Sequence, residues 1–333
     1  CIRDRSLKQG NLVGLPTETV YGLAGNAYSG KAVKKIFKLK KRPKINPLIV
    51  HYNNFKDANK DVIPNKNFYK LYKKFCPGPL TFILKKNTKS KIHPIVTANL
   101  NTVAIRFPSN RIIKTVLKFL NFPLAMPSAN ISSGVSPVSA NHVFEDFEKK
   151  LKIIINGGKS KIGIESTVID LTGRPKILRP GIISSSEIKP FLKVSFAKKN
   201  FKIKSPGMMK KHYSPGIPIV FVGKPSKPSH AYLVFGKKFK KNPNNFNLSK
   251  NANLKEAAHS RASRKPVAHA NAAEVAHVPH AQVQKSRRLL SHEHPGGCSL
   301  AWTSKMLLTH ANFKWLLTHA NCNEATHPCD VYG

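Results

Sequence analysis

The amino-acid sequence predicts an α/β fold for residues 7–194, followed by a linker and a partial second α/β unit. Short β-rich runs alternate with helical patterns from residue 7 to about 194. Hydrophobic residues make up 41% of the 333, enough for a buried core in one large domain or two ordinary ones. Another β-rich run, AYLVFG at 231–236, follows a stretch that contains several prolines and glycines. We therefore place a first domain at 7–194, a linker at 195–224 and a partial second α/β unit at 225–258.

Short apolar runs between turn-forming residues predict the strands of the first domain. The first run, NLVGL, is followed at once by a proline and several hydroxyl side chains. In chain order, the predicted strands are 11–15, 47–52, 80–85, 102–107, 122–126, 152–156, 166–171 and 176–179.

Helical spacing of apolar residues predicts five helices between these strands. In the first, Val33, Ile36 and Phe37 share one face, and Ser29 is suited to cap the N-terminus. In the last, Ser184 and Glu187 have the spacing of a capping box. The five ranges are 30–41, 65–75, 109–120, 139–150 and 184–192.

Composition limits the class of protein. The net charge of +42 fits either a phosphate-rich partner such as a nucleotide or RNA, or a general bias toward lysine. Lysine is scattered through every segment, which favours the second explanation for most of the charge. The five cysteines match no disulfide or zinc pattern, and no apolar run approaches the roughly 20 residues of a membrane helix. We expect a cytoplasmic protein without a membrane anchor.

Both ends of the chain differ from the rest in amino-acid composition. Nine of the fourteen histidines and both tryptophans lie after residue 258, and LLTHAN occurs at both 307–312 and 316–321. A disordered, metal-binding tail is one interpretation. The abrupt change favours the other, a foreign or frame-shifted translation at 259–333. The opening CIRDRS has a similar character, and we expect the natural N-terminus to be missing.

Polar and basic side chains gather where the predicted strands end. LPTETVYGL follows the first strand, KLKKRPKINPLIVH leads into the second, TVAIRFPSN carries an arginine at a strand end, and AMPSANISSGVSP and GIESTVIDL are similar. Lysine and arginine also favour the C-terminal ends of helices, where they complement the helix dipole. The basic cluster at 40–42 is therefore weak evidence for a binding site when it is taken alone. Ligands of α/β sheets bind where loops diverge at strand ends.

Residues 1–194 show no Gly-rich phosphate loop, no metal-ligand pattern and no nucleophile–base pair. These strand ends therefore suit a reaction that depends on positioning and charge neutralisation, as nucleotidyl transfer does.

Together these motifs resemble the threonylcarbamoyl-AMP synthases with a YrdC-like domain. The resemblance covers 7 to about 194 in order and rests on LPTETVYGLAG, the Lys40-Lys41-Arg42 cluster, NPLIVH, CPGPLT, VAIRFP, PSAN, ESTVID and LRPG. SPGMMKKHYSP at 205–215 resembles the linker of the longer, two-domain members. The resemblance implies a twisted mixed sheet with flanking helices. It also implies that L-threonine, bicarbonate and ATP give threonylcarbamoyl-AMP and pyrophosphate, for N6-threonylcarbamoylation of adenosine 37 in tRNA.

The resemblance also implies roles for individual residues. Lys40 and Arg42 would be catalytic, holding the ATP phosphates and stabilising the departing pyrophosphate. The nucleotide side would comprise Arg42, Asn46, Thr102, Ser128, Asn130, Ser136, Arg179 and Tyr213, the last as a lid. The threonine side would comprise Thr19, His51, Arg106 and Ser166. Magnesium would arrive with ATP, a tRNA threonylcarbamoyl transferase would act downstream, and contact with tRNA is possible.

Two other functions stay open at this point. Hydrogenase-maturation carbamoyltransferases have a similar domain but are longer and carry zinc-finger-like cysteine pairs. A basic RNA-binding module without catalysis would suit the charge, but the sequence shows no evident aromatic platform for stacking bases. Glu18 and Tyr21 could equally fix the first loop or touch a substrate.

Overall fold

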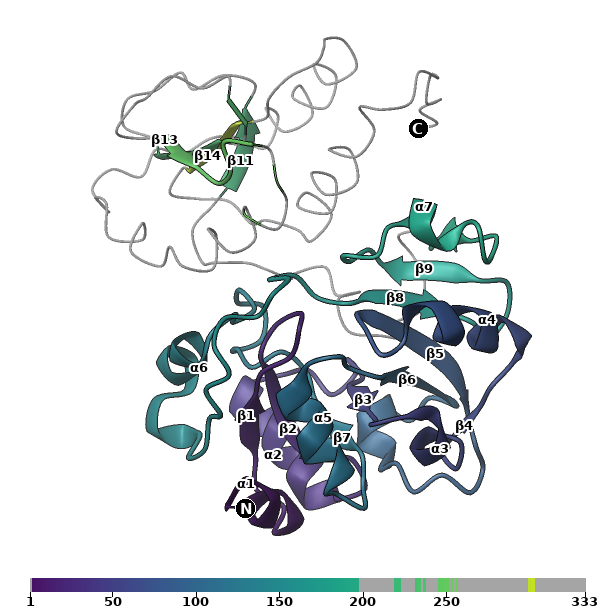
Figure 1. Ribbon diagram of the computed structural model, residues 1–333. Helices are drawn as coiled ribbons and strands as arrows, with labels where there is room; N and C mark the ends of the chain where they lie inside the picture. Colours follow the sequence, from purple (N-terminus) through teal and green to yellow (C-terminus); the bar gives the residue numbers. More distant parts are fainter. Residues whose placement is uncertain are drawn as a thin grey trace. The chain divides into compact units, whose positions relative to one another are not determined.

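The computed structural model describes residues 2–197 and, further on, 219–222, 231–234, 236–237, 245–251, 253, 256 and 299–302. Contacts divide the chain into one unit of Cys1–His212 with His310–Gly333, and a second unit of Tyr213–Thr309. The first unit contains a mixed sheet with helices on its faces (Figure 1).

The sheet of the first unit has ten strands. Its main path runs β1 (Val13–Leu15), β2 (Gly22–Asn26), β7 (Leu124–Ala125), β3 (Ile49–His51), β6 (Thr102–Arg106), β5 (Leu80–Lys86), β8 (Thr167–Asp170), β9 (Lys176–Arg179) and β10 (Ser195–Phe196). β4 (Val62–Ile63) pairs with β5 off this path. The pairs β3–β6, β5–β8 and β9–β10 are parallel, and the other pairs are antiparallel.

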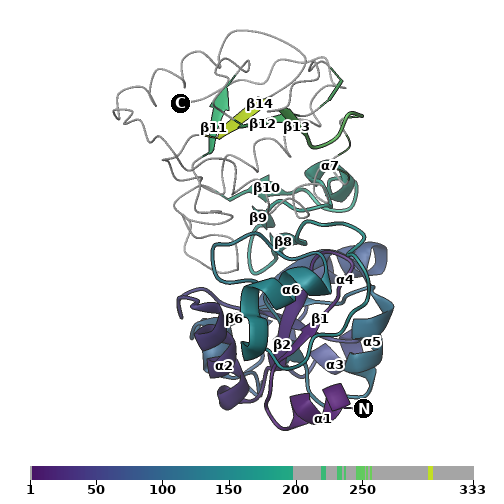
Figure 2. The ribbon, with the colours of Figure 1, turned by 90° about the vertical axis from the view of Figure 1, so that its left-hand side faces the viewer.

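One face of this sheet is covered by helices. Apolar residues of α2 (Gly30–Lys40), α4 (Lys66–Phe75) and α6 (Ala140–Phe147) join one large core with the inner strands. Figure 2 shows α6 in front of β1 and β2, consistent with the close approach of Val143 to Gly14. The short elements α3 (Phe55–Ala58), η1 (Pro94–Thr97), η2 (Glu148–Lys150) and α7 (Ser185–Ile188) complete the unit.

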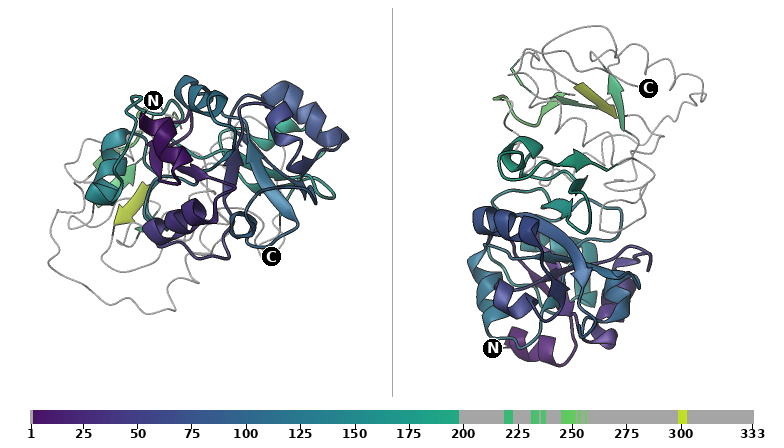
Figure 3. Two further views of the ribbon diagram at one scale, coloured as in Figure 1. Left: turned by 90° about the horizontal axis from the view of Figure 1, so that it is seen from below. Right: turned by 90° about the vertical axis from the view of Figure 1, so that its right-hand side faces the viewer.

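The opposite face is covered by helices only in part. Leu7 of α1 (Ile2–Lys8) and three residues of α5 (Arg111–Lys118) pack on β1, β2 and β7. Figure 3 shows α1 in dark purple beside the N-terminus. Across β3, β6, β5, β8 and β9, the buried cluster on this face comes from strands alone: Ile49, Ala104, Ile83, Val168 and Leu178. No helix of the described residues contributes to that cluster. In this half of the face, the side chains of the strands can therefore contact loops or a ligand.

Most of the predicted strands and helices are confirmed, with ends that differ by a few residues. The predicted strand at 152–156 is wrong: apart from a single bridge between Ile154 and Gly14 it is irregular, because only two backbone hydrogen bonds join it to the edge of β1. α1, α3, η1, β4 and β10 have no predicted counterpart, and β10 falls inside the predicted linker at 195–224. β2 has no predicted counterpart either. Its sequence, GLAGN, holds two glycines and no β-branched residue, yet it lies between β1 and β7 and is almost fully buried.

The second unit contains a four-stranded sheet in the order β11 (Ile219–Val222), β14 (Ser299–Trp302), β12 (Ala231–Val234) and β13 (Asn245–Asn247). β14 comes from the segment predicted to be a foreign tail; the rest of that segment, and the linker after residue 197 up to 218, lie outside the described residues. Among the helices that the structure describes, none is long and apolar enough to cross a membrane.

Candidate functional site

A row of polar side chains crosses the half of the sheet face to which no described helix contributes. His51 of β3 is the register partner of Arg106 of β6, and Arg106 is the partner of Thr81 of β5. Because side chains alternate along a strand, these residues share the face of Ile49, Ala104 and Ile83. The row is buried, with exposed fractions of 2% for His51, 4% for Arg106 and 0% for Thr81.

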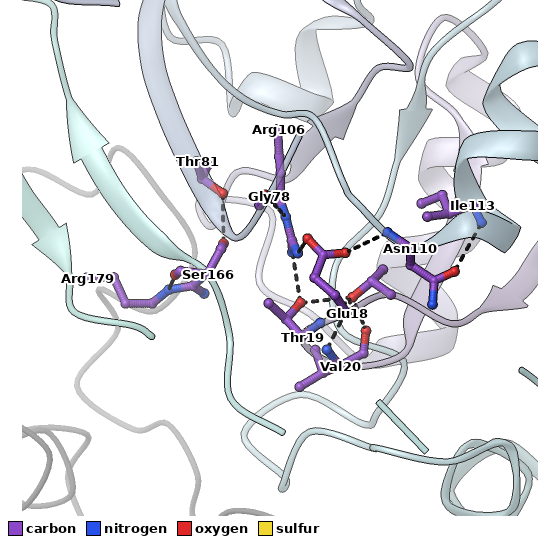
Figure 4. A network of polar contacts seen from close by, with 11 residues as sticks. Glu18, Thr19, Val20, Gly78, Thr81, Arg106, Asn110, Ile113, Ser166 and Arg179 are labelled. Carbon is purple, nitrogen blue, oxygen red and sulfur yellow. Dashed lines mark hydrogen bonds and ion pairs between the residues drawn. The ribbon is translucent and has the colours of Figure 1, made fainter. Parts of the chain in front are cut away.

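Arg106 is held by the loop that follows β1 (Figure 4). Its Nη2 donates to Glu18 Oε1 at 2.6 Å, its Nη1 to Thr19 Oγ1 at 2.9 Å, and its Nε to the Gly78 carbonyl at 3.4 Å. Burial raises the pKa of Glu18, but the charge and hydrogen bond of Arg106 outweigh it and the net pKa is lowered. Glu18 Oε2 also accepts from the backbone N–H of Asn110, the N-cap of α5. The loop, the strand and the helix are therefore joined through one ion pair.

Ser166 and Arg179 form the neighbouring part of the site. Arg179 donates from Nε and Nη2 to the Ser166 carbonyl, at 3.1 and 2.8 Å, and from Nη2 to Ser166 Oγ at 3.0 Å. Ser166 Oγ lies 2.7 Å from Thr81 Oγ1 (Figure 4). The hydroxyl of Ser166 is thus tied to the same row that holds Arg106.

Lys40 ends α2 and is 1% exposed. Its Nζ donates to the carbonyl oxygens of Ser128 and Asn130, at 2.6 and 2.5 Å, and so fixes the loop after β7. Burial and the charge of Arg42 lower the pKa of Lys40 well below its ordinary value, while Glu165 and Asp146 oppose this. An ammonium in such a position would be stabilised by an added anion.

Arg42 lies two residues further, half-buried, and closes its own loop. It donates from Nε to the Asn46 carbonyl at 3.0 Å and from Nη2 to the Pro47 carbonyl at 2.9 Å. Burial and the charge of Arg179 lower the pKa of Arg42 to about 9, and burial and Arg106 lower the pKa of Arg179 to about 10. The cations therefore repel one another, as they do in a site built for a polyanion.

Three buried acceptor atoms of the predicted site residues have no hydrogen-bond partner among the described residues. They are Oδ1 of Asn46, Oδ1 of Asn130 and Nδ1 of His51. Burial first, then the charge of Arg106, lowers the pKa of His51 to about 3, so its imidazole is neutral at pH 7. Buried polar atoms are normally satisfied, so these atoms are suited to receive donors from a ligand.

The other predicted site residues are Ser136, Thr102 and Tyr213. Ser136 donates to Glu165 Oε1 at 2.5 Å. Thr102 is at the start of β6, four residues from Arg106 and roughly 13 Å along the strand, although on the same face. It is thus not brought beside the threonine-side residues, but it is near the level of Pro47, since Ile49 pairs with Ala104. Tyr213 lies outside the described residues.

The structure adds residues that sequence reasoning did not assign to the site: Thr17, Glu18, Thr81 and Glu165. Each of the four belongs to a motif of the family resemblance. Nothing in the sequence indicates that Glu18 contacts Arg106 or that Thr81 contacts Ser166, more than 80 positions away. Tyr21 has a structural role instead: its hydroxyl donates to the Gly158 carbonyl at 2.7 Å and accepts from the Gly157 N–H at 3.0 Å.

The described residues do not fit a protein-held magnesium ion. Within the part of the chain that the structure describes, no three His, Cys, Asp or Glu side chains come together in a way that could hold a metal. Of the two carboxylates of the site, Glu18 is paired with Arg106 and Glu165 accepts from Ser136.

Family models and known proteins match a large part of this chain. The family model of the Sua5, YciO and YrdC proteins, described as "Telomere recombination", matches residues 5–181, and that of "Threonylcarbamoyl-AMP synthase, C-terminal domain" matches residues 183–287. Threonylcarbamoyl-AMP synthase of Pyrococcus abyssi is 42% identical over 230 residues, 66% of each chain. That of Bacillus subtilis is 39% identical over 232 residues, 67% of each chain. This chain thus spans about two thirds of the length of these relatives.

A solved structure has the same fold. The crystal structure of the P. abyssi protein complexed with L-threonine superposes with a TM-score of 0.62 at 42% identity, covering 65% of each chain. The first family model alone matches more than half of the 333 residues. The chain therefore belongs to the threonylcarbamoyl-AMP synthase family, in its two-domain type with a YrdC-like domain followed by the family's C-terminal domain.

Proposed function

We propose that this protein is an L-threonylcarbamoyladenylate synthase. It would convert L-threonine, bicarbonate and ATP into threonylcarbamoyl-AMP, pyrophosphate and water. The observation that carries the proposal is the proximity of two groups of residues: an arginine and hydroxyls on the strand row, and the Lys40 and Arg42 loops. Arg179, which is hydrogen-bonded to Ser166 at the strand row, lies close enough to Arg42 for its charge to lower the pKa of Arg42. Arg106 acts on the pKa of Arg179 in the same way. The first group suits an amino-acid carbamate and the second a triphosphate.

In this proposal, the chain positions two reactants and neutralises charge. Thr19, His51, Arg106 and Ser166 hold threonine and its carbamate, and two N–H groups of Arg106 are left for a carboxylate after the three described contacts. An oxygen of the carbamate attacks the α-phosphorus of ATP, and the bond to pyrophosphate breaks. The negative charge that leaves with pyrophosphate is stabilised by Lys40 and Arg42.

The nucleotide would lie along the other loops. Asn46, Ser128, Asn130, Ser136 and Arg179 are assigned to ATP, with Thr102 further along β6 and Tyr213 as a lid. The unpartnered oxygens of Asn46 and Asn130 support this, since they can accept from an adenine amino group or ribose hydroxyls.

Partners and place in the cell follow from the reaction. The product would pass to a tRNA threonylcarbamoyl transferase for modification of adenosine 37, and tRNA contact would suit the positive charge. Magnesium would accompany the ATP phosphates, and we predict a cytoplasmic location. The solved relative that was crystallised with L-threonine supports the amino-acid assignment.

One assay tests the proposal. The purified full chain should release pyrophosphate from ATP only when L-threonine and bicarbonate are both present, and the product should have the mass of threonylcarbamoyl-AMP. Turnover that requires carbamoyl phosphate instead would favour the maturation-enzyme alternative. RNA binding without any turnover would favour the binding module.

A further inference from the structure

Two hydroxyl groups lie on either side of Arg106, those of Thr19 and Ser166 (Figure 4). A hydroxyl has one proton to donate and two lone pairs that accept. When its protein partners use the proton, it can offer only a lone pair to a ligand; when they use both lone pairs, it offers the proton. The described hydrogen bonds settle which case applies to Ser166.

Thr19 is left able to donate or to accept. Thr17 Oγ1 lies 2.6 Å from the Val20 carbonyl, to which it donates, and it accepts from the backbone N–H groups of Thr19 and Val20, so its proton and both lone pairs are used. The 2.8 Å contact between Thr17 Oγ1 and Thr19 Oγ1 therefore does not fix the Thr19 proton. Arg106 Nη1 donates to Thr19 Oγ1 at 2.9 Å, which leaves Thr19 with its proton and one lone pair.

Ser166 is left as a donor. Thr81 Oγ1 is 0% exposed, and Ser166 Oγ, at 2.7 Å, is its sole hydrogen-bond partner among the residues that the structure describes. The Thr81 proton must therefore go to Ser166, because otherwise it would be buried without an acceptor. Arg179 Nη2, which only donates, lies 3.0 Å from the same oxygen. Both lone pairs of Ser166 are then used, and its proton remains.

We propose that Thr81 is a positioning residue that fixes the direction of the Ser166 hydroxyl, so that Ser166 donates to an anionic oxygen of the substrate. The inference rests on the proposed function, since an amino-acid carbamate carries anionic oxygens. Arg179, which contacts Ser166, favours an anion at that end.

Substitutions of Thr81 test the inference. Thr81→Val removes the hydroxyl and keeps the shape, while Thr81→Ser keeps the hydroxyl and removes a methyl group. L-threonine binding to the full chain is measured by calorimetry. We expect Thr81→Val to weaken binding about tenfold, and Thr81→Ser to stay within about twofold of the wild type.

Three outcomes overturn the inference. Binding by Thr81→Val that equals or exceeds the wild type would mean that Ser166 donates to Thr81, because valine would then release the Ser166 proton to the ligand. Equal weakening by Thr81→Ser would indicate packing rather than hydrogen bonding. A further loss when Thr81→Val is added to Ser166→Ala would show that Thr81 does not act through Ser166. Thr81→Ala also lacks the hydroxyl and carries the same expectation if the valine variant does not fold.

The same measurements separate this inference from the proposed function. Wild-type protein that binds threonine, shows the expected variant pattern and releases no pyrophosphate would contradict the synthase activity alone. Wild-type turnover with unchanged binding by Thr81→Val would contradict the inference alone.

Discussion

Arg106 has two kinds of partner, its own Glu18 and, in the proposed function, the substrate. The ion pair is buried on both sides, with side-chain exposures of 5% and 7%. Removal of one member of such a pair leaves an uncompensated charge in the interior. The pair therefore holds the guanidinium in place before any ligand arrives.

Arg106→Ala should raise the KM for threonine about a hundredfold, because charge-assisted hydrogen bonds to the carboxylate are lost. Glu18→Gln, which keeps the arginine and one hydrogen-bond acceptor, should raise it less. Steady-state pyrophosphate release at varied threonine concentration measures both. A wild-type KM in Arg106→Ala would remove this residue from the site.

His51 makes the unfolding free energy depend on pH. Its folded pKa is about 3 and its ordinary value is 6.5, so below pH 6.5 the unfolded chain binds a proton that the folded chain does not. Stability attributable to His51 should therefore fall by roughly 2 kcal/mol between pH 6.5 and 5, and His51→Gln should lack this part.

Urea denaturation of both proteins at several pH values isolates this contribution as a difference. Glu18 does not interfere, because its pKa lies below 4.5 and it titrates at lower pH. Parallel stability curves for the two proteins would show that His51 is not held neutral by its surroundings.

At the scale of elements, the turn after β9 presses on the start of β8. A Cβ on Gly181 would lie 2.4 Å from the Thr167 backbone nitrogen and 2.5 Å from the Glu165 carbonyl oxygen. Neither backbone atom can move without moving Ser166, which lies between them in the chain. The packing of this turn thus sets the position of a site residue.

Gly181→Ala should destabilise the protein by about 1–3 kcal/mol and weaken threonine binding. Gly173→Ala is the matched control, because a Cβ there meets nothing within 4 Å. Thermal melts followed by circular dichroism compare the two variants. Equal melting temperatures would contradict the tight packing.

Propensity explains which elements were predicted. α2 was found from its apolar face and Ser29 cap, and the structure has Ser29 Oγ accepting from the Ala32 N–H. β2 was missed because two glycines weaken its strand signal, and its place between two strands overrides that preference. The run at 152–156 has strand propensity but only an edge to pair with.

At the scale of the whole molecule, two ligands should stabilise the fold through different residues. A ligand that binds only the folded chain adds about 2.7 kcal/mol at a hundred times its Kd. ATP should lose this effect in Lys40→Ala and keep it in Arg106→Ala, and threonine should show the reverse pattern. Differential scanning fluorimetry with each ligand separately measures the shifts. Loss of both shifts in either variant would mean that the two regions are not independent.

The sequence by itself determined the fold class, most of the strands and helices, and the family, because periodicity, capping and motif order are properties of neighbouring residues. It also predicted that polar strand ends would meet, since strands of one sheet share their edges. Only the tertiary structure decided that Glu18 pairs with Arg106 and that Thr81 contacts Ser166. Each of these contacts joins residues more than 80 positions apart. The direction of a hydroxyl proton depends on every partner within about 3 Å, and strand register and loop packing alone bring those partners together.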